Sequence, residues 1–239
     1  MKDQVVLIVG ASGGIGAATA RLFGKAGAKV VLAARNKEKA ESVAKDINDN
    51  GGEAYVTQVD VTEMSSVVRM VNDIVEELGQ IDVLVNAFGI SIIKPLLDVN
   101  PEDAKTLFDT NMFGTFLVTQ TVMRHMETAK KGTVVMFPGS LGKHVMKNSS
   151  LYSATKFALT GFTKALVEEN KRTNIKFTLL HLGGVATGMY DSDLVDMKVK
   201  KDKMLQPEEA AKAVYYAATQ PGDSVLNELT IQPGSHQMV

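Results

Sequence analysis

Short apolar runs alternate with longer amphipathic segments along the whole chain, and this alternation constrains the fold more than any other feature. Most of the runs are apolar almost throughout, as are strands that are buried on both faces of a sheet. A strand that is followed each time by a helix predicts parallel strands joined by crossover helices. The expected strands span residues 5–9, 29–34, 53–59, 81–86, 132–137, 176–182 and 226–231.

The segments between these strands indicate helices and define the number of domains. Two of them, "PEDAKTLF" and "QPEEAAKAV", begin with a proline and acids, which is typical of a first helical turn. No repeat, low-complexity tract or linker interrupts the chain. We therefore expect one domain over residues 1–239, a doubly wound α/β fold with a seven-stranded, mainly parallel sheet and helices on both faces. The expected helices lie near residues 15–26, 37–49, 63–78, 101–128, 151–172 and 207–219.

The charge balance argues against a polyanion-binding surface. Lysine and arginine number 26 and aspartate and glutamate 27, a net charge of -1, so we expect no nucleic-acid partner. No apolar stretch approaches the ~20 residues of a membrane span. The amino-terminal apolar run is too short for a secretory signal. We expect a protein without a membrane partner.

The chain contains no cysteine, which removes disulfides, thiol nucleophiles and thiolate-bound metals. A cytoplasmic protein is the simplest interpretation. The histidines show no i,i+3 or i,i+4 pairing with acids of the kind that binds zinc, so we expect no metal site. The four histidines are His125, His144, His181 and His236.

The segment "GASGGIG" follows the first expected strand and opens the first expected helix. Doubly wound sheets bind ligands at the carboxyl ends of their strands. Glycines there permit a tight turn, let backbone N–H groups approach a pyrophosphate, and place it at a positive helix terminus. A glycine-rich turn without a ligand is the alternative, but the position in the chain favours nucleotide binding. We expect cofactor contacts from Gly10, Ser12, Gly14, Ile15 and Gly16.

The second strand ends in "VVLAARN", which bears on the choice of cofactor. NAD-binding proteins usually carry an acid here for the ribose 2′-hydroxyl, whereas this chain has Ala34 followed by Arg35. A guanidinium can bind a 2′-phosphate through two hydrogen bonds. An exposed surface arginine is the alternative. We favour NADP(H) over NAD(H), with contacts from Arg35 and Asn36.

Polar residues also follow the third and fourth strands, at Asp60 and Asn86. A short acid after a strand can accept a hydrogen bond from an adenine amino group, or it can cap the following turn. We expect cofactor contacts from Asp60, Val61, Asn86 and Gly89. Asn111 lies inside an expected helix although asparagine is a poor helix former, so something other than propensity favours it.

The stretch "SSLYSATK" at 149–156 places Tyr152 and Lys156 one helical turn apart, on one face of a helix. A free tyrosine has a pKa near 10, and a cation within ~4–6 Å lowers it by favouring phenolate. Lys156 would thus make Tyr152 a usable acid or base. The alternative is a helix start capped by Ser149 or Ser150 with an incidental tyrosine and lysine.

Assembled in this order, the motifs resemble those of the short-chain dehydrogenase/reductase family, in particular its 3-oxoacyl-carrier-protein reductases. The three glycines match the family's cofactor glycines, and Asp60–Val61 its adenine pair. "LGGVAT" at 182–187 is similar to a segment near the nicotinamide, which adds Val185 and Thr187 as cofactor contacts. The residues that match the catalytic tetrad are Asn111, Ser140, Tyr152 and Lys156.

This resemblance implies a Rossmann fold that reduces a ketone or 3-oxoacyl carbonyl to a secondary alcohol with NADPH. Tyr152 would be the general acid, Ser140 would hold the carbonyl oxygen, and Asn111 would orient a water that links Lys156 to solvent. We expect a small-molecule carbonyl substrate in contact with Ser140, Tyr152 and Met189, and a homotetramer or homodimer. The alternatives are an alcohol dehydrogenase working in the oxidative direction and a non-catalytic dinucleotide-sensing protein.

The chain departs from the family pattern at Ala87, Phe88 and Gly183, where asparagine, alanine and proline are usual. We expect these changes to affect substrate fit more than reaction type, and Gly183 to loosen the backbone beside the nicotinamide. The segment 188–204 after Thr187 either covers the cleft, with Met189 and Tyr190 in reach of a substrate, or is a surface excursion. Its basic run at 198–203 is interpreted as a solvated face offset by neighbouring aspartates.

Overall fold

The computed structural model describes residues 1–221 and 224–235, so His236 lies outside the described residues. Within them, seven strands form one sheet in the order β3-β2-β1-β4-β5-β6-β7, and every adjacent pair is parallel. The expected doubly wound α/β fold is confirmed. The strands are β1 (Val5–Val9), β2 (Lys29–Ala34), β3 (Glu53–Gln58), β4 (Val83–Asn86), β5 (Gly132–Met136), β6 (Ile175–Leu182) and β7 (Glu228–Ile231).

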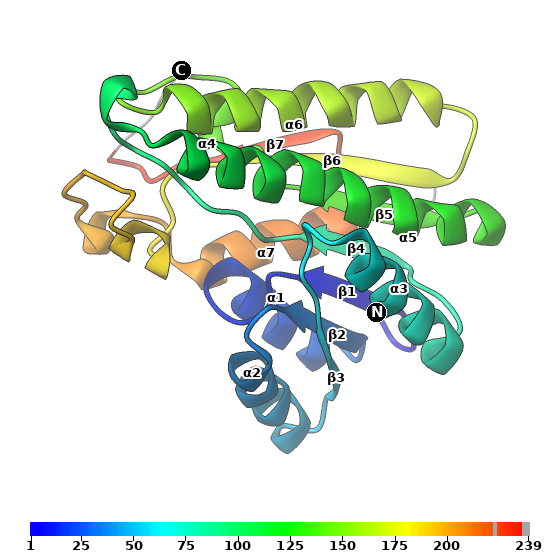
Figure 1. Ribbon diagram of the computed structural model, residues 1–239. Helices are drawn as coiled ribbons and strands as arrows, with labels where there is room; N and C mark the ends of the chain where they lie inside the picture. The colour runs from blue at the N-terminus through cyan, green and yellow to red at the C-terminus, as the bar shows by residue number, and fades with distance from the viewer. Residues whose placement is uncertain (222–223, 236–239) are drawn as a thin grey trace.

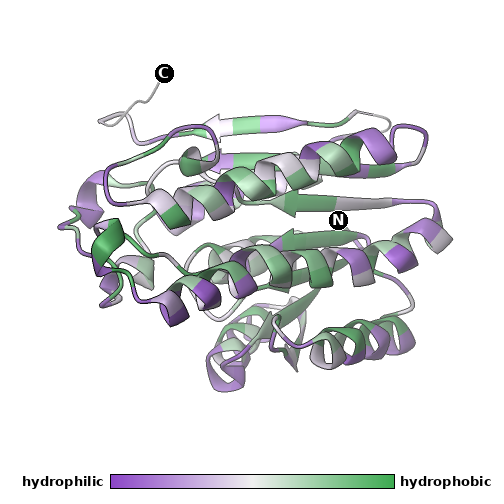
Figure 2. Cartoon of the chain, turned by 45° about the horizontal axis from the view of Figure 1, so that its top comes forward, coloured by the Kyte–Doolittle hydropathy of each residue, from purple (hydrophilic) through white to green (hydrophobic). Residues whose placement is uncertain are grey.

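Helices cover both faces of the sheet (Figure 1). One core cluster packs residues of α3, α5 and α6 on one face, and a second packs residues of α1, α2 and α7 on the other. Figure 2 shows the consequence, since the central strands are mostly hydrophobic while the helices carry hydrophilic stripes. The helices are α1 (Gly14–Lys25), α2 (Lys37–Asp49), α3 (Met64–Leu78), α4 (Pro101–Phe108), α5 (Thr115–Ala129), α6 (Ser150–Glu169) and α7 (Pro207–Ala218).

The order of the strands reverses at β1, which pairs with β2 on one side and β4 on the other. The connections after β1 and β4 therefore leave in opposite directions, and a crevice opens between the ends of these strands. Every predicted strand-end residue belongs to this carboxyl edge or to the helices that border it.

The expected helix 101–128 is interrupted by a π-helical turn, Asp109–Gly114, between α4 and α5. Asn111 lies in this turn and bonds to the backbone of Ile90, which accounts for an asparagine inside a helical segment. Single π-helical turns occur often at functional sites. Gly114 packs tightly here, since a Cβ on it would lie 2.9 Å from Val61 Cγ2.

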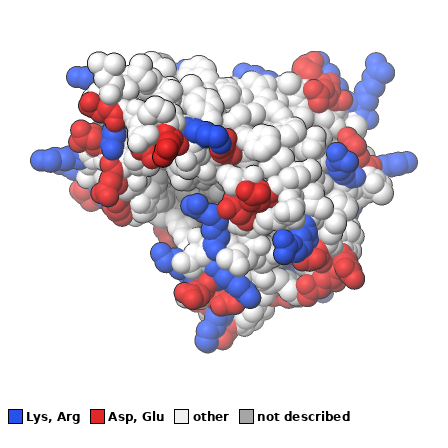
Figure 3. Space-filling view, viewed as in Figure 1, with Lys and Arg blue, Asp and Glu red and all other residues white. Residues whose placement is uncertain are grey.

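Charged side chains of both signs are interspersed on the face seen in Figure 3, with an uncharged area between them. Among the residues described, no helix is long and apolar enough to span a bilayer. The same residues include no group of three or more His, Cys, Asp or Glu side chains arranged to hold a metal ion.

Candidate active site

A crevice of about 600 Å³ lies at the reversal between β1 and β4. Its walls come from the ends of β1, β2, β3 and β4 and from the turns that follow them. The lining residues are Val9, Gly10, Ser12, Ala34, Arg35, Asn36, Val59, Val61, Ala87, Phe88, Gly89, Ile90 and Thr110.

The glycine turn fits a dinucleotide pyrophosphate because its backbone is packed too closely for side chains. Gly10 has a φ of 91°, and a Cβ there would lie 2.7 Å from the Ala87 carbonyl oxygen. A Cβ on Gly16 would lie 2.2 Å from the Gly10 carbonyl oxygen. The N-cap residue of α1 is Gly13, which has no side chain to accept from the first N–H groups of the helix. These N–H groups suit an anionic ligand. Ile15, in the same turn, packs against the core instead.

Arg35 is exposed and lines both this crevice and a neighbouring cavity that includes Asp60. Asn36 lines the crevice but is also the N-cap of α2, where its side chain accepts from Lys39 N at 2.9 Å. The residue at the end of β2 is Ala34 and not an acid, so no carboxylate there repels a phosphate.

Asp60 caps the turn after β3, one of the two roles considered for it. Its Oδ1 accepts from Thr62 N at 3.0 Å and from Thr62 Oγ1 at 2.7 Å. These bonds hold the pKa of Asp60 below its usual value, and the charge of nearby Arg35 adds to the effect. Val61, the next residue, lines the crevice between β1 and β4.

Asn86 is buried at the end of β4 and does not line the crevice, although we expected a cofactor contact there. Its Nδ2 donates to Thr119 Oγ1 at 3.1 Å and to Met136 Sδ at 3.3 Å. The side chain thus points into the core between β4, α5 and β5, where it supports the strand end. Gly89, three residues later, does line the crevice.

A second cavity of about 500 Å³ adjoins the first, since Ile90 lines one and Ser91 the other. Ser140 and Tyr152 both line it, together with Met189. Its lining residues are Ser91, Ile93, Ser140, Leu141, Met146, Tyr152, Gly184, Met189, Tyr190, Met197, Lys198, Val199, Lys200, Lys203, Met204 and Pro233.

Tyr152 and Lys156 share one face of α6, but they interact differently from the expectation. Lys156 is buried, donates from Nζ to the Phe137 carbonyl oxygen at 2.9 Å, and lies 5.5 Å from the centre of the Tyr152 ring. Burial lowers the pKa of Lys156 to about 8. Burial also raises the pKa of Tyr152 above its usual value, with a smaller contribution from Tyr190. The expected lowering of the tyrosine pKa is therefore not found, because desolvation raises this pKa.

Asn111 ties the loop after β4 to the helix that carries Tyr152. Its Oδ1 accepts from Ile90 N at 2.9 Å, and its Nδ2 donates to the Ile90 carbonyl oxygen at 2.9 Å and to Thr155 Oγ1 at 3.2 Å. A Cβ on Gly89 would lie 3.0 Å from Asn111 Oδ1. The side chain thus bonds to protein partners, and it fixes the loop where the two cavities meet.

Thr187 lies against the glycine turn, since a Cβ on Gly14 would lie 3.0 Å from Thr187 Cγ2. The Thr187 hydroxyl accepts from Met189 N at 3.4 Å and so starts the covering segment. Val185 is buried, forms a parallel bridge with Leu205, and lines neither cavity.

Gly183 lies where the segment after β7 approaches closely. A Cβ there would lie 2.8 Å from Pro233 Cδ and 3.2 Å from Gln232 Cα. The glycine lets this segment pass directly over the strand end, and Pro233 lines the second cavity.

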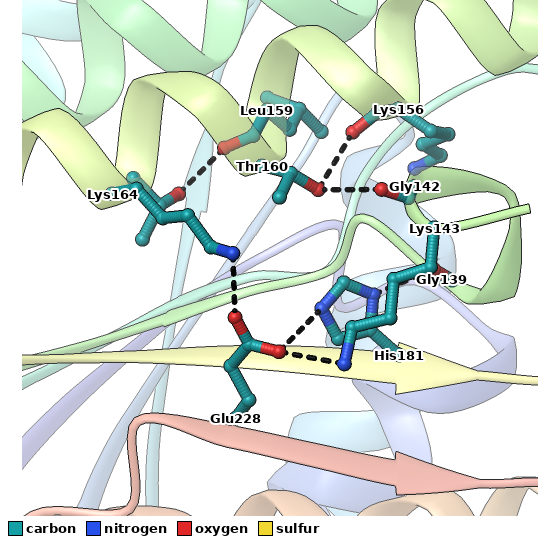
Figure 4. A network of polar contacts seen from close by, with 10 residues as sticks. Gly139, Gly142, Lys143, Lys156, Leu159, Thr160, Lys164, His181 and Glu228 are labelled. Carbon is teal, nitrogen blue, oxygen red and sulfur yellow. Dashed lines mark hydrogen bonds and ion pairs between the residues drawn. The ribbon is translucent and has the colours of Figure 1, made fainter.

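A polar network supports the turn that carries Ser140 (Figure 4). Gly139, just before Ser140, has a φ of 66°, and its carbonyl oxygen lies 3.0 Å from His181 Nδ1, which must donate. The Gly142 carbonyl oxygen, on the other side, accepts from Thr160 Oγ1 at 3.1 Å. The backbone around Ser140 is therefore held from β6 and α6.

Glu228 of β7 completes this network. Its carboxylate pairs with Lys143 Nζ at 2.6 Å and Lys164 Nζ at 3.0 Å, and His181 Nε2 lies 3.7 Å away. The hydrogen bonds from Lys143 and Lys164 lower the pKa of Glu228 to about 2. Burial lowers the pKa of His181. We did not predict a supporting role for either residue; the only signal is a histidine that follows the apolar pair Leu179–Leu180 in β6.

The fold and the paired cavities define a dinucleotide-binding oxidoreductase. The family model for short chain dehydrogenases matches residues 4–197. An uncharacterized oxidoreductase of Staphylococcus haemolyticus is 34% identical over 234 residues, 98% of each chain. The chain belongs to the short-chain dehydrogenase family.

Two solved structures of the family resemble the chain over nearly its whole length. A metagenomic short-chain oxidoreductase in complex with NADP is 29% identical, covers 98% of each chain and has a TM-score of 0.85. An actinorhodin polyketide ketoreductase with NADPH is 29% identical, covers 97% of this chain and 96% of its own, and has a TM-score of 0.87.

Proposed function

We propose that the protein uses NADPH to reduce a ketone or 3-oxoacyl carbonyl to a secondary alcohol. The observation that carries this proposal is the position of Ser140 and Tyr152, two hydroxyl side chains that line one cavity beside the dinucleotide crevice. The NADP complexes of related structures and the name of the polyketide ketoreductase support it.

The residues of the crevice would hold the cofactor in distinct ways. The glycine turn and the amino terminus of α1 would bind the pyrophosphate, and Arg35 would bind the 2′-phosphate. Once bound, the cofactor supplies a hydride to the carbonyl carbon. The absence of an acid at Ala34 supports the choice of NADPH.

The chain's own side chains handle the proton. Because burial raises its pKa, Tyr152 is protonated at neutral pH and can donate its hydroxyl proton to the carbonyl oxygen as negative charge develops there. Ser140 would hold the same oxygen through a hydrogen bond. Lys156, cationic below a pKa of about 8, would stabilise the phenolate that donation leaves.

The choice of cofactor bears on the alternatives. Tyr152 would donate a proton in reduction and accept one in oxidation, so the site itself serves both directions. Arg35 favours NADP(H), and because cells usually keep their NADP pool reduced, this favours reduction over an alcohol dehydrogenase working oxidatively. A dinucleotide sensor without catalysis would not require Ser140 and Tyr152 to line one cavity.

The replacement of Tyr152 by phenylalanine tests the proposal. Tyr152→Phe keeps the ring but removes the proton, so turnover of an accepted ketone should fall by about 100-fold or more while NADPH binding changes little. Tyr216→Phe, on the exposed side of α7, is the matched control and should retain full turnover. Full turnover by Tyr152→Phe would contradict the assignment. Unaltered NADPH binding without reduction of any carbonyl by the wild-type protein would favour a sensor.

We also propose a homo-oligomer that associates through α5 and α6. Phe113 and Phe157 are 49% and 43% exposed, and Phe116 and Phe162 line a groove between the two helices. An exposed apolar surface of this kind is typical of subunit contacts. Sedimentation should give a dimer or tetramer mass that falls in a Phe113→Ser/Phe157→Ser variant, and a wild-type monomer would contradict the proposal.

A further inference from the structure

The covering segment, residues 188–204, separates its charges in space. It carries four lysines and four aspartates, so its formal charge is zero. Lys198, Lys200 and Lys203 line the second cavity, whereas none of the four aspartates does. The lysines of the basic run are exposed, as expected for a solvated face, and three of them also line the second cavity.

The ion pairs of the segment reinforce this separation. Lys201, the lysine that does not line the cavity, binds both carboxylate oxygens of Asp191, at 2.6 and 2.8 Å. No ion pair between described residues includes any of the three lining lysines. All three lining lysines are exposed, and none of these ion pairs ties up their ammonium groups.

The rest of the cavity wall includes both hydroxyl and apolar side chains. Ser140 and Tyr152 supply the hydroxyls at which a carbonyl oxygen would bind. Four methionines supply flexible apolar surface: Met146, Met189, Met197 and Met204. No aspartate or glutamate is found among the lining residues that the structure describes.

We propose that the substrate carries an anionic group at a distance of several bonds from its carbonyl. The ammonium groups of Lys198, Lys200 and Lys203 would bind this anion, while the methionines contact the carbon chain between them. A lysine ammonium acts as a point charge that binds carboxylate and phosphate alike. The chemistry that these ligands share is a terminal anion. This inference rests on the proposed reductase function and specifies its substrate class.

Matched substrates test the anion directly. The oxo acids 4-oxopentanoate, 6-oxoheptanoate and 8-oxononanoate are each compared with their methyl esters, which keep the carbonyl and the chain but lose the charge. We expect kcat/KM with NADPH to favour at least one acid over its ester by about 10-fold or more, and the ratio to fall as NaCl rises from 50 to 500 mM. A phosphate monoester of a hydroxyketone of the same length then distinguishes the source of the anion, and preference for either anion supports the proposal.

Lysine variants link the preference to the covering segment. In Lys198→Gln/Lys200→Gln/Lys203→Gln the acid-to-ester ratio should fall to near one while reduction of the ester is retained. The control, Lys25→Gln/Lys45→Gln/Lys171→Gln, makes the same change in net charge. Two of its residues lie at or just beyond the carboxyl ends of α1 and α6, at the opposite edge of the sheet, and it should keep the ratio. If the triple variant melts early, the three single variants give the same comparison.

The outcomes separate this inference from the proposed function. If the wild-type protein reduces each ester with the same kcat/KM as its acid, the inference is overturned and the reductase function still stands. Loss of the preference in both triple variants would also overturn it, because net charge rather than the lining lysines would then be responsible. Protein that binds NADPH but reduces none of the compounds would overturn the reductase function itself.

Discussion

The two cavities at the carboxyl edge of the sheet are built from different parts of the chain. The dinucleotide crevice is formed by strand ends and a glycine turn, so backbone atoms define its shape. The second cavity is covered by residues 188–204, which form short 3₁₀ turns and one isolated β-bridge, and side chains define its walls. The first should tolerate few substitutions, and the second should adapt to them.

The glycines of the two cavities express this difference. A Cβ on Gly16 would meet only backbone atoms, the nearest at 2.2 Å. A Cβ on Gly184 would meet Met204 Cε at 2.6 Å, and this atom ends a flexible side chain that can move. The same added methyl group should therefore have unequal effects at the two positions.

The largest effect is expected from Gly16→Ala. Because the carbonyl of Gly10 cannot move without shifting β1, the variant should bind NADPH about 100-fold more weakly or worse, as measured by fluorescence titration. Gly161→Ala in α6 is the control, since a Cβ there meets nothing within 4 Å and lies outside the glycine turn. NADPH affinity equal to wild type in Gly16→Ala would show that the turn is not a rigid cofactor site.

A smaller effect is expected from Arg35→Gln. Backbone atoms define the shape of the dinucleotide crevice, but the preference for NADPH over NADH is proposed to depend on the side chain of Arg35. Loss of a charge-assisted contact with the 2′-phosphate should lower the ratio of NADPH to NADH affinity by about 10- to 100-fold. Arg172→Gln, beyond the end of α6, should leave the ratio unchanged. An unchanged ratio in Arg35→Gln would assign 2′-phosphate recognition to another group.

Gly184→Ala is expected to act on the substrate alone. Displacement of the Met204 side chain should raise the KM for the carbonyl compound severalfold and leave NADPH affinity unaltered. Gly161→Ala in α6, where a Cβ meets nothing within 4 Å, should change neither quantity and should stabilise the helix slightly. Impaired NADPH binding in Gly184→Ala would show that the two cavities are not independent.

The same division explains how much of the molecule could be predicted from the sequence. Apolar runs and glycines report backbone geometry, so the sheet and the turn at Gly10–Gly16 follow from them. Which way a side chain turns at a strand end does not follow, and Asn86 accordingly points into the core. Which lysines line the second cavity could not be predicted either, because 3₁₀ turns and loops impose no periodicity on residues 188–204.

Contacts between residues that are distant in the sequence are a second feature that could not be predicted. His181 and Glu228 are 47 residues apart, and they meet only because β6 pairs with β7. No local pattern contains this pairing, yet it supports the turn that carries Ser140. The turn that carries Ser140 therefore belongs to the second cavity, whose walls are side chains. Because His181 and Glu228 are titratable, the stability of this turn should depend on pH.

The smallest effect that we predict is the pH dependence of this support. The folded-state pKa of Glu228 is about 2, below its ordinary 4.5, so its contribution to stability is present above about pH 4.5 and is lost as the pH falls toward 2. The pKa of His181 is also lowered, so the unfolded chain takes up a proton first on acidification, and stability falls below about pH 6.5. Both groups make the folded state less stable in acid.

Glu228→Gln should remove the stabilising effect of the carboxylate and lower the melting temperature by a few degrees at pH 7. The difference in melting temperature from wild type should disappear as the pH falls from about 4.5 to 2. Asp49→Asn is the control, because it removes an exposed ion pair with Lys45 and should change the melting temperature by about one degree at most. Because the network holds Gly139 and the turn of Ser140, the KM for substrate at pH 7 should rise in Glu228→Gln while NADPH affinity stays constant. A difference from wild type that persists at pH 2 would show that the effect of Glu228→Gln does not come from loss of the carboxylate charge. Weaker NADPH binding would show that the turn also supports the dinucleotide crevice.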